Sequence, residues 1–326
     1  MKSRNHTFDL LCGLCMLGFI VAVAADHCKM HNAAWAVEIR WWTYLAVGLF
    51  FFKAGYFSPK ADEPLMPQLR RKARRLLVPY VIWSVVGMGL YFGFLHFFPE
   101  ALHTYREAVN WTQAWQTGQW YGNPALWVLP CLFVSSVIGM GMLRLHGASI
   151  AAVLLPFISW WLSRQGNPLW LGLNNVFVGI YLYVLGHWWA WLERRMEPTR
   201  FMFLSAVLSV AALTANILLH GEYSMADNQW TGCVPAAIAN ASLALCGLTG
   251  AFQSILTHPV PWLGFVGRRS MAFLVLPYPM VTYYNFVHLI GKRTMTGHWN
   301  DFITAAVLTA CLCAWLAREF DTKNST

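Results

Sequence analysis

The chain has 326 residues, of which 57% are hydrophobic and only 11% are charged. Its mean hydropathy of +0.45 lies above the range of soluble globular domains and excludes that class. These values predict a polytopic membrane protein, whose partners are membrane lipids and not nucleic acid.

Ten apolar segments follow one another along the chain. A hydrocarbon core about 30 Å thick needs roughly 20 apolar residues per helix. The segments are continuous apolar runs, unlike the alternating ten-residue segments of a β-barrel. They predict an all-α transmembrane bundle of about ten helices, forming a single domain over residues 1–326. The predicted spans are residues 8–25, 35–57, 76–97, 125–143, 148–163, 171–192, 201–219, 231–255, 270–290 and 302–317.

Basic residues are distributed unequally between the predicted loops. If the amino terminus is cytoplasmic, about sixteen Lys and Arg residues lie on the inner side and about five on the outer side. This asymmetry predicts that both termini are cytoplasmic, and we expect the protein in a bacterial cytoplasmic (inner) membrane. No His or Cys spacing in the sequence is typical of a metal site, so we expect no metal.

The densest charge is the run RRKARRLLVPYVIW, from Arg70 to Trp83, in the predicted inner loop at 60–74. One interpretation is a topology anchor that also contacts anionic lipid head groups. The other is a phosphate site, because arginine binds phosphate oxygens through two parallel hydrogen bonds.

Five short motifs occur along the chain: RNHTFDLLCGLCML, FFFKAGYF, RRKARRLLVPYVIW, NPALWVLPCLF and LGFVGRRSM. In order and spacing they resemble the integral-membrane acyltransferase 3 family, which acylates sugars and glycans. The resemblance implies a cytoplasmic acyl-CoA donor, no permanently bound cofactor, and a hydroxyl acceptor on a carbohydrate. On that basis Arg71, Arg74 and Arg75 would hold the CoA phosphates, and Lys53 would add to the same site.

The sequence departs from this family at its usual imidazoles. The first family motif reads Asp, then Arg, then a catalytic His; here Asp9 is present, Cys12 takes the Arg position and Val23 the His position. A second usual His position, after the last motif, is Pro277.

Acyl transfer to a hydroxyl needs a base within hydrogen-bond reach. His27 lies four residues beyond Val23, so it would share a helix face with the usual position. We therefore expect His27 and Asp9 to be catalytic. The alternatives are an ordinary polar His27 at the outer membrane boundary, or a base at His187 or His288.

The predicted outer loop from Trp111 reads WTQAWQTGQWYGNPALW, with tryptophans at helical spacing. It predicts either an interfacial amphipathic helix or a carbohydrate platform. For the second interpretation the substrate-binding candidates are Trp115, Trp120 and Asn123.

The function most consistent with these features is O-acetylation or a related polysaccharide modification. A membrane acyltransferase would move an acyl group, expected to be acetyl, from acyl-CoA to a hydroxyl of a surface carbohydrate or glycolipid. The alternative is a non-catalytic relative that binds or translocates a glycan or lipid-linked intermediate. A secondary transporter is disfavoured, because no pair of short, glycine-interrupted helices indicates an internal repeat.

Overall fold

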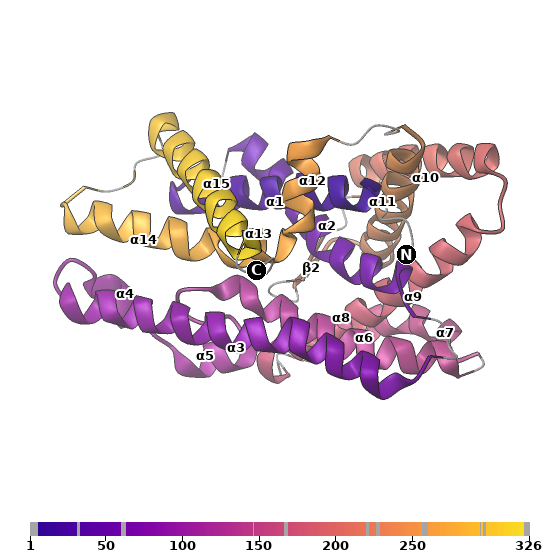
Figure 1. The fold of residues 1–326 in the computed structure, drawn as a ribbon, viewed down its shortest axis with the longest axis horizontal. Helices are drawn as coiled ribbons and strands as arrows, with labels where there is room; N and C mark the ends of the chain where they lie inside the picture. Colours follow the sequence, from indigo (N-terminus) through magenta and orange to yellow (C-terminus); the bar gives the residue numbers. More distant parts are fainter. Residues whose placement is uncertain are drawn as a thin grey trace.

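The computed structural model describes most of the chain, and this part is almost entirely helical (Figure 1). Six of its helical stretches are long and apolar enough to cross a membrane: His6–His27, Leu65–Phe97, Pro124–Arg144, Pro198–Ala215, Val234–Gln253 and Trp299–Arg318. The predicted all-α transmembrane fold is confirmed. The described residues are 6–30, 33–59, 63–145, 147–165, 169–219, 222–225, 229–255, 260–293, 295 and 298–322.

Each of the ten predicted segments forms helix. Six of them are single continuous helices. These are α1 (His6–His27), α2 (Ala34–Tyr56), α3 (Leu65–Phe97), α10 (Pro198–Leu219), α11 (Val234–Ile255) and α15 (Trp299–Thr322). One of these, α3, continues through an internal proline, Pro79.

The other four predicted segments are assembled from shorter pieces. A proline ring removes a backbone donor and clashes with the preceding turn, so it favours the start of a new helix. Pro277 begins α14 in this way, after Leu276 has ended the short helix before it. The pieces are η1 (Pro124–Trp127) with α6 (Val128–Arg144); α7 (Ala148–Ala151), η2 (Ala152–Leu154) and α8 (Leu155–Gln165); η3 (Trp170–Asn175) with α9 (Val176–Glu193); and α13 (Ser270–Val275) with α14 (Pro277–Ile290).

The sequence predicts a loop for the basic run. The structure instead places the run in the first turns of α3. This helix has 33 residues and begins at Leu65. At 1.5 Å per residue it is about 50 Å long, well beyond a hydrocarbon core of about 30 Å. The surplus length carries Arg70 to Arg75 on a helix that extends past the apolar region.

The remaining elements are short. The segment from Trp111 begins with a short helix, α5 (Trp111–Thr117), where the Asn110 side chain caps the first turn by accepting from the Gln113 amide. A two-stranded antiparallel hairpin, β1 (Glu222–Ser224) and β2 (Gln229–Thr231), was not expected. The others are α4 (His103–Glu107) and α12 (Pro261–Arg268).

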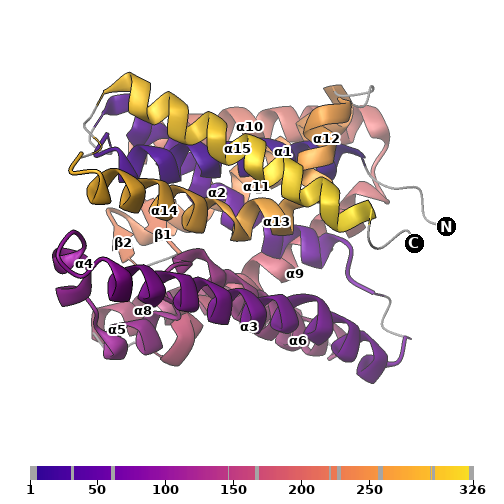
Figure 2. The ribbon, with the colours of Figure 1, turned by 60° about the vertical axis from the view of Figure 1, so that its left-hand side comes forward.

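In Figure 2, α3, α5, α6 and α8 lie on one side of the molecule and α1, α14 and α15 on the other. The two sides are joined where α2 packs along α9. Glycine makes this approach possible: a Cβ on Gly55 would overlap the backbone of Tyr183, and one on Gly186 would overlap the carbonyl of Phe52. The Tyr183 and Phe52 side chains are fully buried in the resulting core.

The start of α1 and the end of α15 meet at one end of the molecule. A Cβ on Gly267 of α12 would overlap the carbonyl oxygen of Asp9, so α12 lies directly against α1. Two residues on, burial and the neighbouring cations Arg268 and Arg318 lower the pKa of Arg269. Arg318 belongs to the last turns of α15. The first turns of α1 and the last turns of α15 therefore lie at the same end of the helical bundle.

Candidate active site

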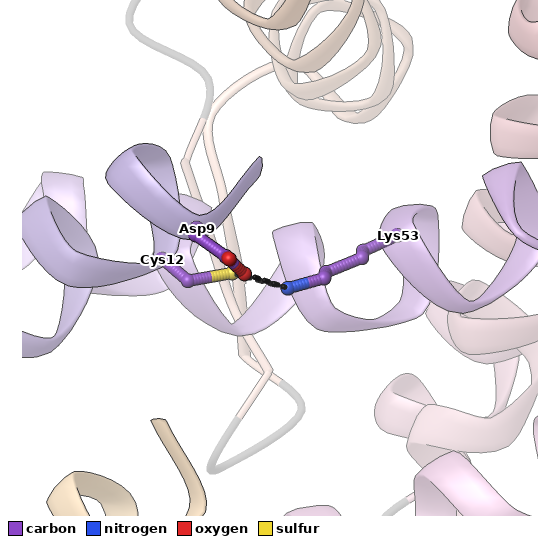
Figure 3. A network of polar contacts seen from close by, with 3 residues as sticks. All are labelled: Asp9, Cys12 and Lys53. Carbon is purple, nitrogen blue, oxygen red and sulfur yellow. Dashed lines mark hydrogen bonds and ion pairs between the residues drawn. The ribbon is translucent and has the colours of Figure 1, made fainter. Parts of the chain in front are cut away.

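A buried ion pair joins the beginning of α1 to the end of α2 (Figure 3). The Nζ atom of Lys53 lies 3.8 Å from Oδ1 of Asp9 and donates to Sγ of Cys12 at 3.4 Å. The Asp9 side chain is 8% exposed and that of Lys53 is 26% exposed. The positive charge of Lys53 is therefore paired with the carboxylate of Asp9, and Lys53 is not a free cation.

The family resemblance leads us to expect an arginine at the position of Cys12. In its absence, the ammonium group of Lys53 neutralises the carboxylate of Asp9. Lys53 Nζ touches both side chains, so α2 supplies the positive charge from outside α1. A partly buried carboxylate without such a partner would be costly. The local sequence of α1 cannot show this substitution, because the lysine is 41 residues away from Cys12.

His27 is the last residue of α1, and both of its ring nitrogens have partners. Nδ1 lies 3.0 Å from the carbonyl oxygen of Val23, and Nε2 lies 3.2 Å from Oγ1 of Thr282 in α14. The ring also stands edge-on to Tyr278, with centroids 6.1 Å apart. The side chain is half-buried between α1 and α14.

These two hydrogen bonds select one tautomer of His27. A carbonyl oxygen can only accept, so Nδ1 must carry the hydrogen that it donates to Val23. In a neutral imidazole Nε2 is then the unprotonated nitrogen, and it accepts from the hydroxyl of Thr282. The basic nitrogen thus points at a hydroxyl group in the arrangement that a general base requires.

The two predicted catalytic residues share a face of α1 but not an end of it. Asp9 precedes His27 by eighteen residues, which is five turns and about 27 Å along the axis. The structure therefore does not bring Asp9 and His27 together. Asp9 belongs with Lys53, and His27 belongs with Thr282.

The predicted CoA-binding arginines are exposed on one face of α3. Arg71, Arg74 and Arg75 stand on the same exposed face as Val78 and Ile82. Lys72 points the other way, and its Nζ lies 5.4 Å from the ring centroid of Tyr183 in α9. The arginines are free to meet an anionic group, whether on a donor molecule or on a lipid.

The three predicted substrate residues differ in accessibility. Trp115 is 49% exposed and stands edge-on to Trp120, with ring centroids 5.0 Å apart. Trp120 is buried and its indole N–H donates to the Tyr80 hydroxyl at 2.6 Å. Asn123 is fully buried and its side-chain amide donates to the Val275 carbonyl at 2.7 Å. Of the three, Trp115 alone presents a large open surface.

Asn123 and His27 are held by the same segment of the chain. Asn123 is bonded to Val275 at the end of α13, and His27 to Thr282 in α14. Val275 and Thr282 are seven residues apart, or about 10 Å along a helix. Pro277, the second position where the family resemblance leads us to expect histidine, lies between them. His27 and Asn123 are thus both bonded to the α13–α14 segment.

Sequence reasoning missed the partners that orient the histidines. Thr282 is 255 residues from His27, and a further pair, His187 and Ser58, is 129 residues apart. No local pattern connects residues at such separations, and a lone threonine in a helix gives no signal. In the ranges that the structure describes, no group of three or more His, Cys, Asp and Glu side chains could hold a metal ion.

Comparison with known proteins bears on this geometry. A family model described as an acyltransferase domain, acyltransferase 3, matches residues 12–318. The match begins at Cys12 and ends at Arg318, so it includes Lys53, His27 and Thr282 and begins three residues after Asp9. No curated protein matches the chain. Because the family model covers nearly the whole chain, the protein belongs to the acyltransferase 3 family and is a membrane acyltransferase.

Proposed function

We propose that this protein transfers an acyl group, most simply acetyl, from acyl-CoA to a hydroxyl group of a surface carbohydrate or glycolipid. The observation that carries the proposal is His27, whose unprotonated Nε2 faces the Thr282 hydroxyl while Nδ1 is fixed by Val23. A positioned imidazole of this kind supplies a base. The chain lacks one at Val23 and Pro277, the two positions where the family usually has histidine.

The chemistry needs two proton movements at His27. The acceptor hydroxyl takes the place of the Thr282 hydroxyl at Nε2 and gives its proton to that nitrogen, while its oxygen attacks the thioester carbonyl. The carbon–sulfur bond then breaks, and the imidazolium returns the proton to the leaving sulfur of CoA. The Val23 carbonyl keeps the ring in this orientation throughout, and Thr282 holds it before the acceptor binds.

The donor enters from the other end of α1 in this proposal. Lys72 contacts Tyr183, whose backbone lies against Gly55, so the basic run of α3 lies near the Lys53 end of α2. CoA phosphates bound by Arg71, Arg74 and Arg75 would place the pantetheine arm alongside α1. Asp9 would act here by holding Lys53, rather than by touching His27.

Replacing Arg71, Arg74 and Arg75 together by Gln is expected to weaken CoA binding by about tenfold or more. Charge-assisted hydrogen bonds contribute on the order of 1.5–3 kcal/mol each, so the loss of one true phosphate ligand gives that effect. Equilibrium binding of CoA to purified protein measures it. Arg200→Gln, at another exposed arginine, is the matched control. Unchanged CoA affinity in the triple variant would make the run a lipid anchor.

A reporter fused after Thr326 is expected to be cytoplasmic, and so is a label attached near residue 63 at the start of α3. The reason is the excess of Lys and Arg on that side, which sets the orientation of membrane proteins. Protease protection and thiol labelling in intact cells measure both positions. Exposure of either position on the outer surface would place the basic run away from cytoplasmic CoA.

A further inference from the structure

A second imidazole–hydroxyl pair lies away from His27. Oγ of Ser58, two residues after the end of α2, is 2.7 Å from Nδ1 of His187 in α9. Both residues are partly exposed. A serine hydroxyl within hydrogen-bond reach of an imidazole is the arrangement that activates serine as a nucleophile.

This pair lies beside the basic run of α3. Tyr183 precedes His187 by one helical turn and therefore shares its face of α9. Lys72, between the arginines of the run, lies over the Tyr183 ring. A thioester donor whose phosphates met Arg71 or Arg75 would bring its acyl end to Ser58 with its arm turned toward α9, and not with the arm laid along α1 toward His27.

The pair is also far from His27. The ring of Phe8, near the start of α1, packs against Tyr56 and Phe57 with centroids 4.6 and 5.2 Å away, immediately before Ser58. His27 is nineteen residues further along α1, or about 28 Å. One bound acyl group cannot reach both pairs at once, so Ser58 and His187 are a separate place for chemistry.

A pocket of about 450 Å³ opens next to this end of α2. Its wall includes Glu193, which accepts a hydrogen bond from Tyr56, and Gln253, whose amide donates to the same Tyr56 hydroxyl at 3.1 Å. Oε1 of Gln253 is buried and has no hydrogen-bond partner among the described residues. Glu193 and Gln253 are polar residues of a pocket whose other walls include Met196, Phe201 and Met202.

We propose that Ser58 is a nucleophile that accepts an acyl group and that His187 is its base. The inference rests on the proposed function only in taking an acyl thioester as the donor. The Ser58 oxygen attacks the thioester carbonyl while Nδ1 of His187 takes the hydroxyl proton. The carbon–sulfur bond breaks, the proton passes to the leaving sulfur, and an acyl ester remains on Ser58.

A second transfer releases the acyl group. A hydroxyl of an acceptor molecule, or water, attacks the ester carbonyl and gives its proton to His187. The bond between the acyl carbon and the Ser58 oxygen breaks, and the proton returns to that oxygen. The pair is thereby restored with no oxidant, reductant or metal.

The test is to incubate the purified full-length protein with acetyl-CoA labelled in its acetyl group, without any acceptor. After denaturation, mass spectrometry of the peptide that contains Ser58 is expected to show a labelled acetyl ester. Ser58→Ala should abolish this label, and His187→Ala should slow its formation by about a hundredfold or more. Ser58→Cys should give instead a thioester that hydroxylamine removes, which keeps the test valid if the alanine variant is poorly folded.

Ser242→Ala is the matched control, because Ser242 also forms a side-chain hydrogen bond, to the Tyr181 hydroxyl at 2.6 Å, but has no imidazole partner. This variant should be labelled like the wild type. A wild-type protein without label on Ser58 would overturn the inference, and if that protein still acylates carbohydrate, the proposed function stands alone. Label on Ser58 without any carbohydrate acylation would support the inference and remove the proposed acceptor.

Discussion

Replacing His27 by Ala is expected to lower the rate of acyl transfer by about a hundredfold or more, with CoA affinity little changed. A positioned general base contributes roughly 10²–10⁴ to a rate, and the tautomer of His27 leaves Nε2 unprotonated and able to accept a proton. Steady-state transfer from labelled acetyl-CoA, with CoA binding measured separately, gives both numbers. Because the loss comes from the transition state, it should appear in kcat.

The same experiment has a built-in rescue and a matched control. Val23→His in the His27→Ala background is expected to restore part of the activity, since it returns an imidazole to the same face one turn earlier. His288→Ala removes another histidine, which packs against Tyr284 on α14, and should leave the rate nearly unchanged. Full activity in His27→Ala would move the base elsewhere. An inactive wild type that Val23→His alone makes active would instead identify a binding relative.

Thr282→Val is expected to lower the rate less than His27→Ala, and Thr282→Ser to keep most of it. The threonine hydroxyl donates to Nε2, so its role is to orient the ring and not to take the proton. This order of effects distinguishes loss of the base from loss of its orientation.

Asp9→Asn is expected to destabilise the protein by on the order of 3 kcal/mol, the largest effect on stability that we predict. Removing one member of a buried ion pair leaves the other charge without compensation, at a cost of about 3–5 kcal/mol. Lys53 is 26% exposed, which places the effect at the lower end of that range. Unfolding of the purified protein in detergent, followed by circular dichroism, measures it.

A double-mutant cycle separates the ion pair from other losses at Asp9. Lys53→Met in the Asp9→Asn background should recover most of the stability, because the charge that lacks a partner is then gone. Asp26→Asn, at an exposed acidic residue near the other end of α1, is the control and should change stability by less than about 0.5 kcal/mol. If Asp9→Asn were as mild as Asp26→Asn, the pair with Lys53 would not be what holds α1 to α2.

The sequence predicts the helices well because apolar length is a local property. Each predicted span contains helix, and α1 and α2 differ from their predicted limits by at most two residues. The first turns of α3 were missed because their charges interrupt the apolar run that was used to place spans. The break before Pro277 was missed because the surrounding residues remain apolar on both sides of it.

The candidate site is less predictable because its contacts join distant parts of the chain. Cys12 looks like a lost arginine in the sequence, yet Lys53 brings a cation to the same place from α2. His27 could be selected from helical periodicity, but its partner Thr282 could not. Asp9 and His27 are both expected from the sequence to be catalytic, and five turns of α1 separate them.

We propose that this chain moves an acyl group onto a carbohydrate hydroxyl. The most direct test compares cells with and without the gene after growth with labelled acetate, and searches their surface glycans and glycolipids for labelled acyl esters by mass spectrometry. We expect an ester that is present with the wild-type gene, absent without it, and strongly reduced with His27→Ala. Identical glycan acylation in all three strains, together with no transfer by the purified protein from labelled acetyl-CoA, would contradict it.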